Sequence, residues 1–570
     1  MKPFFIKPAV LALILGLVAS GCSKSGKKNE DSSGGGSAPI TQGENEKLKI
    51  PKDAANLDPY SCKRFYQYLS DMDTLHLQEK SVGSVVRLQK VVTVYAENLQ
   101  KKGIDVSDYK EENVKENDCT EIEKLAGKLV GNKKLMDALG ETEGEFDPLA
   151  YVYENILYVF TNSLDHFSSF YGEHYIRSVG FEGSVNTGFR FLSRSDYYTV
   201  SDVDDKLVKE GRHPPYLYVE QTPEYLKNIL PRYSKIYKIR DKNVKDMSMF
   251  ESLAMMSRKG SVSLVVAFPS DQYATQKTID VKLQQQEPLE TGFRMISQNP
   301  NIGYLKISSF NKNGTDSDLY KSWIEYLMNS PAKLDGTIID LRTNTGGRVD
   351  EMQKFAGTIL SDPNTIVSHR IVKGRKGYFV TDEKSLDSFP LNYGKIVVLT
   401  DFMTASASEM FVAALQDYKA GIAVGESSIG KGIGQRGIGI NSEHIQGEAH
   451  VTNFYMASPS GKSWYLDGLQ PDIEVKEKAN EGYYWKLRNK EKIIPGALKE
   501  SFDYEFDPAV EVRNTISDEN LAKLKAFRND PAQEPTECKT DPKELPEEQS
   551  CIYAWGLKIL NEWIRISKPQ

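Results

Sequence analysis

The chain has 570 residues, a length that allows roughly three or four domains, and 39% of its residues are hydrophobic, as expected of soluble globular structure. Its formal net charge of −7 at pH 7 argues against nucleic acid as a partner.

The first 22 residues predict a lipoprotein signal peptide. Lys2 and Lys7 precede an apolar run, residues 9–18, that is too short to span a bilayer, and Ala19-Ser-Gly-Cys22 follows. This resembles a bacterial lipobox, in which Cys22 is lipidated after cleavage, and Ser23 is what the sorting rule implies for outer-membrane delivery. We therefore expect a bacterial cell-envelope protein, an outer-membrane lipoprotein that faces the periplasm and is held in the lipid bilayer through Cys22. An ordinary signal peptide is the alternative.

The next segments predict a linker and two non-catalytic domains. Residues 23–49 are rich in Ser, Gly, Lys, Asn and Glu, so they bury too little apolar surface to fold and predict a flexible linker. Residues 50–177 predict a helical N-terminal domain, because apolar residues recur at helical spacing. Residues 178–287 predict short strands with one helix. The expected strands are 216–219, 236–239, 262–267 and 279–283.

Four cysteines remain when Cys22 is set aside, an even number that an oxidising compartment would pair. Of the three connectivities that four cysteines allow, we expect Cys62 with Cys119 and Cys538 with Cys551, because each pair lies within one terminal region. Four buried free thiols are the alternative. The spacings are not those of a zinc site, so no metal is expected.

Residues 288–478 alternate strands with helices, which predicts an α/β sheet. Within them, 395–400 predicts a short buried strand, and the capping box that runs from Ser406 to Glu409 predicts the start of a helix. Ser406 therefore lies where a strand turns into a helix, and the amide of Ala407 is an unpaired donor there. A hydroxyl beside such amides suits acyl transfer, because the amides can hold the oxyanion that forms.

A second predicted strand, 422–425, leads into a loop with Lys431 between Gly430 and Gly432. A lysine that is kept neutral by burial or by a cationic neighbour can act as a base for a serine nucleophile. Glycine on both sides lets the backbone bring the amine close to Ser406. Gln435, four residues on, is suitably spaced to orient that amine.

Together, Thr-Ala-Ser-Ala-Ser-Glu at 404–409 and Gly-Lys-Gly followed by Gln435 resemble the carboxyl-terminal processing (tail-specific) serine protease family. Residues 336–347 resemble the strand and glycine turn of that family, and 458–461 and 468–472 match its closing motifs. The resemblance implies a site that works without a cofactor. In it Ser406 is the nucleophile, Lys431 the base and Gln435 its orienting partner, and the oxyanion hole is formed by the backbone of Ala407 with that of Gly346 or Gly347.

The resemblance also implies the architecture, an α/β fold with a crotonase-like or Clp-like layered catalytic core and an inserted or preceding PDZ-like domain. The segment of Gly188, Phe189, Arg190 and Phe191 resembles the loop by which PDZ domains hold a terminal carboxylate, with Arg190 at the second glycine position. His166 belongs to an element that introduces the PDZ domain, and we expect no catalytic role for it. Asp417 matches an acidic position of the family, but a helix places it about 16 Å from Ser406, so a structural role is expected.

Simpler readings exist for these residues. Ser406 alone predicts a helix N-cap, and Lys431 alone a solvated surface lysine. Residues 425–431 have P-loop spacing, but Gly432 stands where magnesium binding needs Ser or Thr, so a nucleotide binder is disfavoured.

Residues 479–570 predict a C-terminal helical region that ends in a helix over 551–566. The function predicted for the whole chain is a lipid-anchored periplasmic serine endopeptidase. Its partners would be protein or peptide substrates with a free C-terminus and, in addition, an envelope adaptor protein. The alternative is a non-catalytic PDZ-type adaptor lipoprotein of the envelope.

Overall fold

The computed structural model describes the chain in segments that are separated by gaps. They are 62–77, 83–101, 103–133, 147–165, 168–172, 187, 189–192, 216–231, 234–244, 252, 255–285, 292–310, 321–329, 333–360, 364–373, 375–381, 392–441, 446–465, 467–476, 515–539 and 550–568. The predicted signal peptide with Cys22, the linker 23–49, His166, Gly188 and residues 479–514 lie outside them. None of the helices within the described segments combines the length and apolar character needed to cross a membrane.

The chain divides into two compact units. Unit 1 comprises 289–434 and 454–570, together with residues 1–43, which lie outside the described segments. Unit 2 comprises 44–288 and 435–453, so the short segment 435–453 groups with the N-terminal half of the chain rather than with the expected 288–478 core.

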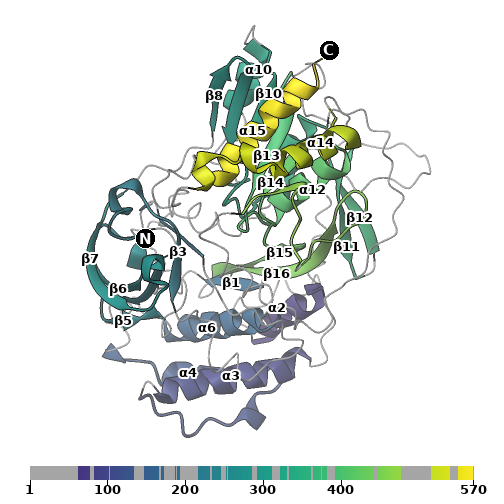
Figure 1. Ribbon diagram of the computed structural model, residues 1–570. Helices are drawn as coiled ribbons and strands as arrows, with labels where there is room; N and C mark the ends of the chain where they lie inside the picture. The colour runs from purple at the N-terminus through teal and green to yellow at the C-terminus, as the bar shows by residue number, and fades with distance from the viewer. Residues whose placement is uncertain are drawn as a thin grey trace, which may run out of the picture. The chain divides into compact units, whose positions relative to one another are not determined.

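Unit 1 is built on a six-stranded mixed sheet with the strand order β17-β14-β13-β10-β9-β8 (Figure 1). Every neighbouring pair is parallel except β8 and β9. The bounds are β8 Gly292–Gln298, β9 Asn301–Lys306, β10 Gly336–Asp340, β13 Lys395–Thr400, β14 Ile422–Gly425 and β17 Ile473–Glu474. The apolar runs of β13 and β14 predicted these strands with the bounds that the structure has.

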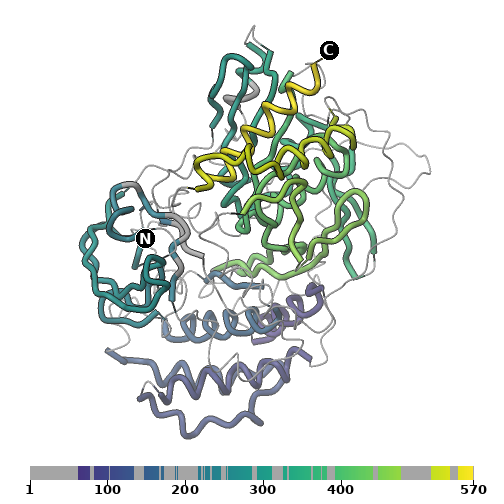
Figure 2. Tube along the Cα trace, viewed as in Figure 1, coloured from purple at the N-terminus to yellow at the C-terminus, as the bar shows by residue number. Residues whose placement is uncertain are grey.

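Helices cover both faces of this sheet, because its buried strands send successive side chains to opposite sides. Ile339 and Val398 face one cluster with α11 (Val349–Gly357) and α12 (Ala407–Asp417). Ile338 and Val397 face the other cluster with α15 (Cys551–Ile566), which runs along the sheet as the yellow tube of Figure 2. Unit 1 is thus a mixed α/β structure in which a helix from the C-terminal region closes one face. Its remaining helices are α10 Lys321–Asn329, α14 Asp518–Asn529, η8 Pro531–Gln533 and η9 Thr536–Cys538.

A second sheet begins in unit 1, where β11 (Ile366–Val372) pairs antiparallel with β12 (Arg375–Val380) and with the end of β16. Strand β16 (Gln446–Ala457) continues across the boundary between the units along the chain. In unit 2 its earlier residues pair with β1 (Ser169–Gly172). Strand β15 (Ile433–Asn441) also pairs with β16.

Unit 2 contains a helical part, whose apolar faces form one core together with side chains of 438–451. Its helices are α2 Cys62–Leu75, α3 Ser84–Lys101, η2 Glu111–Asn113, α4 Thr120–Gly127 and α6 Pro148–Asn162. Unit 2 also contains an antiparallel sheet with the order β2-β3-β4-β6-β7, in which β5 also pairs with β4. It has its own apolar core. The bounds are β2 Arg190–Leu192, β3 Leu217–Gln221, η3 Glu224–Leu226, β4 Lys235–Ile239, β5 Lys242–Asn243, β6 Gly260–Ala267, η5 Pro269–Asp271 and β7 Gln276–Leu283.

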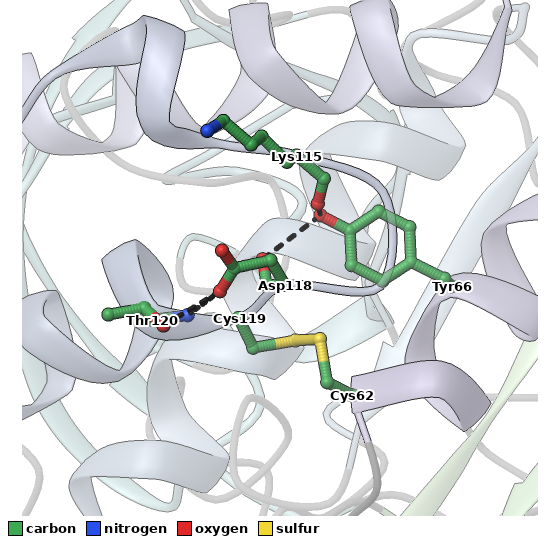
Figure 3. The surroundings of a disulfide bond; sticks show 6 residues. All are labelled: Cys62, Tyr66, Lys115, Asp118, Cys119 and Thr120. Carbon is green, nitrogen blue, oxygen red and sulfur yellow. Dashed lines mark hydrogen bonds between the residues drawn. A yellow bond between two sulfur atoms is a disulfide. The ribbon is translucent and has the colours of Figure 1, made fainter.

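Each unit contains one disulfide, and both are the pairs expected from the sequence. In unit 2, Cys62 at the start of α2 is bonded to Cys119 at the N-cap of α4 (Figure 3). The Tyr66 hydroxyl donates to the carbonyls of Lys115 and Asp118 beside this bond. In unit 1, Cys538 is bonded to Cys551.

The two disulfides should differ in their contribution to stability. The cysteines are 57 residues apart in the first pair and 13 in the second, and a crosslink stabilises more when it closes a longer loop. Replacing Cys62 and Cys119 by Ser is expected to lower the free energy of unfolding by about 4 kcal/mol, and replacing Cys538 and Cys551 by about 3 kcal/mol. Urea unfolding followed by circular dichroism checks this, and the reverse order of the two losses would contradict it.

Candidate active site

Ser406 lies in the turn between β13 and α12, as the sequence predicts. Its backbone angles are φ 57° and ψ −119°, a conformation that costs free energy for a residue with a Cβ and persists only when neighbours hold it. One of these constraints is the Ala405 amide, which donates to the Asn344 carbonyl over 3.0 Å. The Ser406 side chain is partly exposed, so a substrate can approach the hydroxyl at this strained turn.

The glycine turn after β10 packs directly against Ser406. A Cβ placed on Gly346 would lie 2.8 Å from the Ser406 Cβ and 2.9 Å from the Ala407 nitrogen, so only glycine fits. The Gly346 amide donates to Asn344 Oδ1 over 2.9 Å and is therefore occupied. Among the described residues the amides of Ala407 and Gly347 have no hydrogen-bond partner. This favours Gly347 over Gly346 as the second oxyanion donor, an alternative that the sequence left open.

The buried carboxylate of Asp401 connects the glycine turn to the Ser406 turn. It accepts the Thr343 amide, with 2.9 and 3.0 Å to its two oxygens, and the amides of Met403 and Thr404, each over 3.0 Å. The Thr404 hydroxyl in turn donates to the Leu341 carbonyl over 3.0 Å. Burial raises the pKa of Asp401, and the Thr343 amide opposes this rise. The two turns therefore form one crosslinked frame.

A second buried carboxylate, that of Glu409, joins the Ser406 turn to the Lys431 loop. Its Oε2 accepts the Ser406 amide over 2.7 Å, which is one half of the predicted capping box. Its Oε1 accepts the Ser428 hydroxyl and, over 2.8 Å, the Gly430 amide. Burial raises the pKa of Glu409 to about 7, against hydrogen bonds from Ser428 and from the amides of Ser406, Gly430 and Lys431. One carboxylate thus bonds the backbone on either side of the proposed dyad.

Lys431 lies in the loop between β14 and β15 and is partly buried. Gly432, the residue after it, approaches Tyr465 so closely that a Cβ there would lie 2.8 Å from the Tyr465 nitrogen. The Gly432 carbonyl accepts the Met456 amide over 2.9 Å. Contacts on both sides of Lys431 therefore hold its backbone. Gln435 follows in β15.

The remaining expected residues have partners of their own. Asp417 is the last residue of α12, and its carboxylate accepts the Ser460 amide over 2.7 Å. It therefore holds the turn at 458–461, a contact that fits a structural role. Phe189 packs against the core of the unit 2 sheet, and Arg190 and Phe191 begin its edge strand β2.

Sequence reasoning treated Glu409 only as a capping residue and overlooked Asp401. The Ser-x-x-Glu spacing did point to Glu409, but its partners Ser428 and Gly430 are 19 and 21 residues away in sequence. Asp401 had no local signal, because its partner Thr343 is 58 residues away.

Comparison with known proteins supports the resemblance. Residues 301–475 match the family model described as Peptidase family S41. A carboxy-terminal-processing protease of Bartonella bacilliformis is 29% identical over 259 residues, 44% of this chain and 55% of that protein. The carboxy-terminal processing protease CtpB of Bacillus subtilis is 26% identical over 230 residues, 40% of this chain and 44% of that protein.

The tail-specific protease of Haemophilus influenzae is 31% identical over 185 residues, 31% of this chain and 25% of that protein. The matches thus span about half of these relatives or less. A solved structure titled photosystem II D1 C-terminal processing protease is 17% identical, with a TM-score of 0.42, and the match covers 68% of this chain and 93% of that one.

The raised pKa of Glu409 predicts how stability depends on pH. The unfolded carboxyl loses its proton near its ordinary value of 4.5 and the folded one near 7, so between these values the folded state holds more protons. The free energy of unfolding should therefore fall as the pH rises, by about 3 kcal/mol from this group. Replacing Glu409 by Gln should remove this part of the dependence.

Urea unfolding at pH values from 5 to 8, followed by tryptophan fluorescence, measures this effect. All five tryptophans lie in the ranges of unit 1, so the signal reports that unit. The exposed Glu474 of the same unit is the control, and Glu474→Gln should follow the wild type. Parallel curves for the wild type and Glu409→Gln would contradict the assignment.

Proposed function

We propose that this chain, which carries a peptidase family S41 segment at residues 301–475, is a serine endopeptidase that cuts proteins with a Ser406–Lys431 dyad. The observation that carries the proposal is the Glu409 carboxylate, which bonds the Ser406 amide on one side and the Gly430 amide on the other. It ties the strained serine turn to the lysine loop, beside the amides of Ala407 and Gly347, for which the described segments provide no partner. If Ser406 were only the N-cap of α12, its turn would need no contact with the lysine loop or the glycine turn.

The proposed reaction is acyl transfer to Ser406 followed by hydrolysis of the acyl-enzyme. The Ser406 oxygen attacks the peptide carbonyl while its proton passes to the neutral Lys431 amine, which Gln435 orients. The amides of Ala407 and Gly347 hold the oxyanion of the tetrahedral intermediate. When the carbon–nitrogen bond breaks, the Lys431 ammonium gives its proton to the leaving amine. Water, activated by the same lysine, then releases the acyl chain and restores Ser406.

Recognition of substrate tails forms the second part of the proposal. The unit 2 sheet is PDZ-like, and β2 is the last strand of its order, paired with β3 alone among the described strands. A peptide added to β2 as a further strand would bring its terminal carboxylate to the loop of Gly188, Phe189, Arg190 and Phe191. Unit 1 in this reading is the crotonase-like or Clp-like layered core.

The cellular setting is the third part. A lipid on Cys22 and the linker 23–49 would hold the enzyme at the outer membrane, on its periplasmic side, where an envelope adaptor protein could deliver substrates. The two disulfides support an oxidising compartment, because such bonds are rare in the cytosol.

Removing either member of the dyad should abolish proteolysis. With denatured casein as substrate, Ser406→Ala and Lys431→Ala are each expected to lower the rate by more than about 10³-fold. Ser427→Ala and Lys419→Ala are the controls and should retain the wild-type rate. In the part of the chain that the structure describes, the Ser427 side chain bonds Gln470 and the Lys419 side chain bonds Asp518, and neither bonds the dyad. An inactive wild type would refute the endopeptidase and leave the non-catalytic envelope adaptor.

Tail recognition predicts sensitivity to the substrate C-terminus. Amidation removes a charged acceptor whose hydrogen bonds contribute about 1.5–3 kcal/mol each, so kcat/KM should fall by at least about 10-fold. One unfolded peptide would be compared in its free-acid and amidated forms, with N-terminal acetylation as the control for charge removal. Equal rates for the acid and the amide would remove this part of the proposal.

A further inference from the structure

A contact from the C-terminal helix reaches the start of the glycine turn in unit 1. Arg342 lies two residues after the end of β10, and its Nη1 donates to the Ser550 hydroxyl over 2.5 Å. Ser550 is the N-cap of α15, and its hydroxyl also accepts the Tyr553 amide over 3.4 Å. Ser550 lies well beyond residues 301–475, so this contact joins the family-matched segment to a part of the chain outside it.

The Arg342 side chain is buried and held at several points. Its Nε and Nη2 donate to the two oxygens of Asp340 over 2.9 and 2.6 Å. The backbone carbonyl of Arg342 also accepts a hydrogen bond from Lys306 Nζ over 2.8 Å. Burial opposes ionisation of Asp340, but Arg342 and Lys306 keep its pKa well below the ordinary range. Ser550 thus provides a further anchor, from outside the turn, for a buried guanidinium, and removing its hydroxyl removes one of the bonds that hold this group in place.

Thr343 connects the anchored Arg342 to the turn that packs against Ser406. Thr343 has a φ of 64°, which is strained for a β-branched residue and persists only when both of its sides are fixed. The Asp401 carboxylate accepts the Thr343 amide on one side. On the other side, the preceding residue Arg342 is held by Asp340 and Ser550. The turn then continues through Asn344, whose carbonyl accepts the Ala405 amide, to the glycine that packs against Ser406.

The Cys538–Cys551 disulfide holds the start of α15, next to Ser550. Cys551, the first residue of α15, is bonded to Cys538 at the end of η9. The residue next to Ser550 is therefore tied covalently to a neighbouring element, while Trp555 and Leu560 bury the helix in the sheet core. The Ser550 hydroxyl is held in place even though it belongs to a terminal segment.

We propose that Ser550 is a positioning residue for the reaction, and that the Cys538–Cys551 bond holds it against Arg342 so that the turn 342–347 keeps its oxyanion donor in place. This inference rests on the proposed function. It assigns the C-terminal segment a role in turnover in addition to its role in folding. Ser550 does not touch substrate and acts through Arg342 and Thr343.

The first test compares variants of two N-cap serines. Ser550→Ala should lower kcat about 10-fold with KM within about twofold, because misplaced oxyanion donors act on the transition state. Ser550→Thr keeps a hydroxyl and should stay within about twofold of the wild-type kcat. Ser517 caps the neighbouring α14, where its hydroxyl accepts the Asn520 amide, and within the described segments it makes no bond to the glycine turn. Ser517→Ala should therefore lose a cap without losing kcat. Assays are run well below each variant's unfolding midpoint.

The second test uses the two disulfides. Replacing Cys538 and Cys551 by Ser should lower kcat by the same factor as Ser550→Ala, and adding Ser550→Ala to this variant should lower it no further. Replacing Cys62 and Cys119 in unit 2 is the matched control and should leave kcat unchanged. Losses that multiply independently, or a wild-type kcat in Ser550→Ala, would overturn the inference.

Amide hydrogen exchange tests the inference separately from activity. A peptide covering 341–348 should exchange faster in Ser550→Ala and in the Cys538/Cys551 variant than in the wild type and Ser517→Ala. Unchanged exchange would overturn the inference even if the wild type proved inactive. An inactive wild type with the expected exchange pattern would refute only the proposed function.

Discussion

The candidate site depends on one buried carboxylate, that of Glu409, which has to satisfy donors from two segments at once. A carboxylate in an apolar interior is stable only when hydrogen bonds replace its lost hydration. Here the donors are the Ser406 amide on one side and the Ser428 hydroxyl and Gly430 amide on the other. If either segment moved away, it would leave charge or donors unpaired in the core. Glu409 thereby constrains the distance between the serine turn and the lysine loop through their backbone amides.

The sheet of unit 1 explains why the glycine turn after β10 lies beside the Ser406 turn after β13. Strands β10 and β13 are neighbours and run parallel, so their carboxyl ends lie side by side and the turns that follow them meet. Asp401 then crosslinks these turns through Thr343. Two carboxylates with different partners thus connect three loops. Strain at Ser406 and Thr343 is tolerated because several bonds determine each position.

The sequence predicted the elements whose signals are local. The β-branched run of β13 and the capping box of α12 depend on neighbouring residues, and both appear where expected. It left Gly346 and Gly347 unresolved, because only the side chain of Asn344 decides which amide is occupied. The contact between Arg342 and Ser550 joins residues 208 positions apart, and no periodicity or motif spacing reports such a pair. The long strand β16 was also missed, since its partners come from both halves of the chain.

The docking of α15 has a bearing on self-digestion. If the chain cuts extended polypeptides as proposed, its own segments must not reach the site in extended form. Trp555 and Trp563 are almost completely buried, and pulling such a side chain into water costs roughly 2 kcal/mol or more for each one. Residues 551–566 form a helix whose first residue is tied by a disulfide, so they cannot be presented as an extended strand without dismantling one face of the sheet. For the proposed endopeptidase, the packing that completes unit 1 would thus also protect α15 against autolysis.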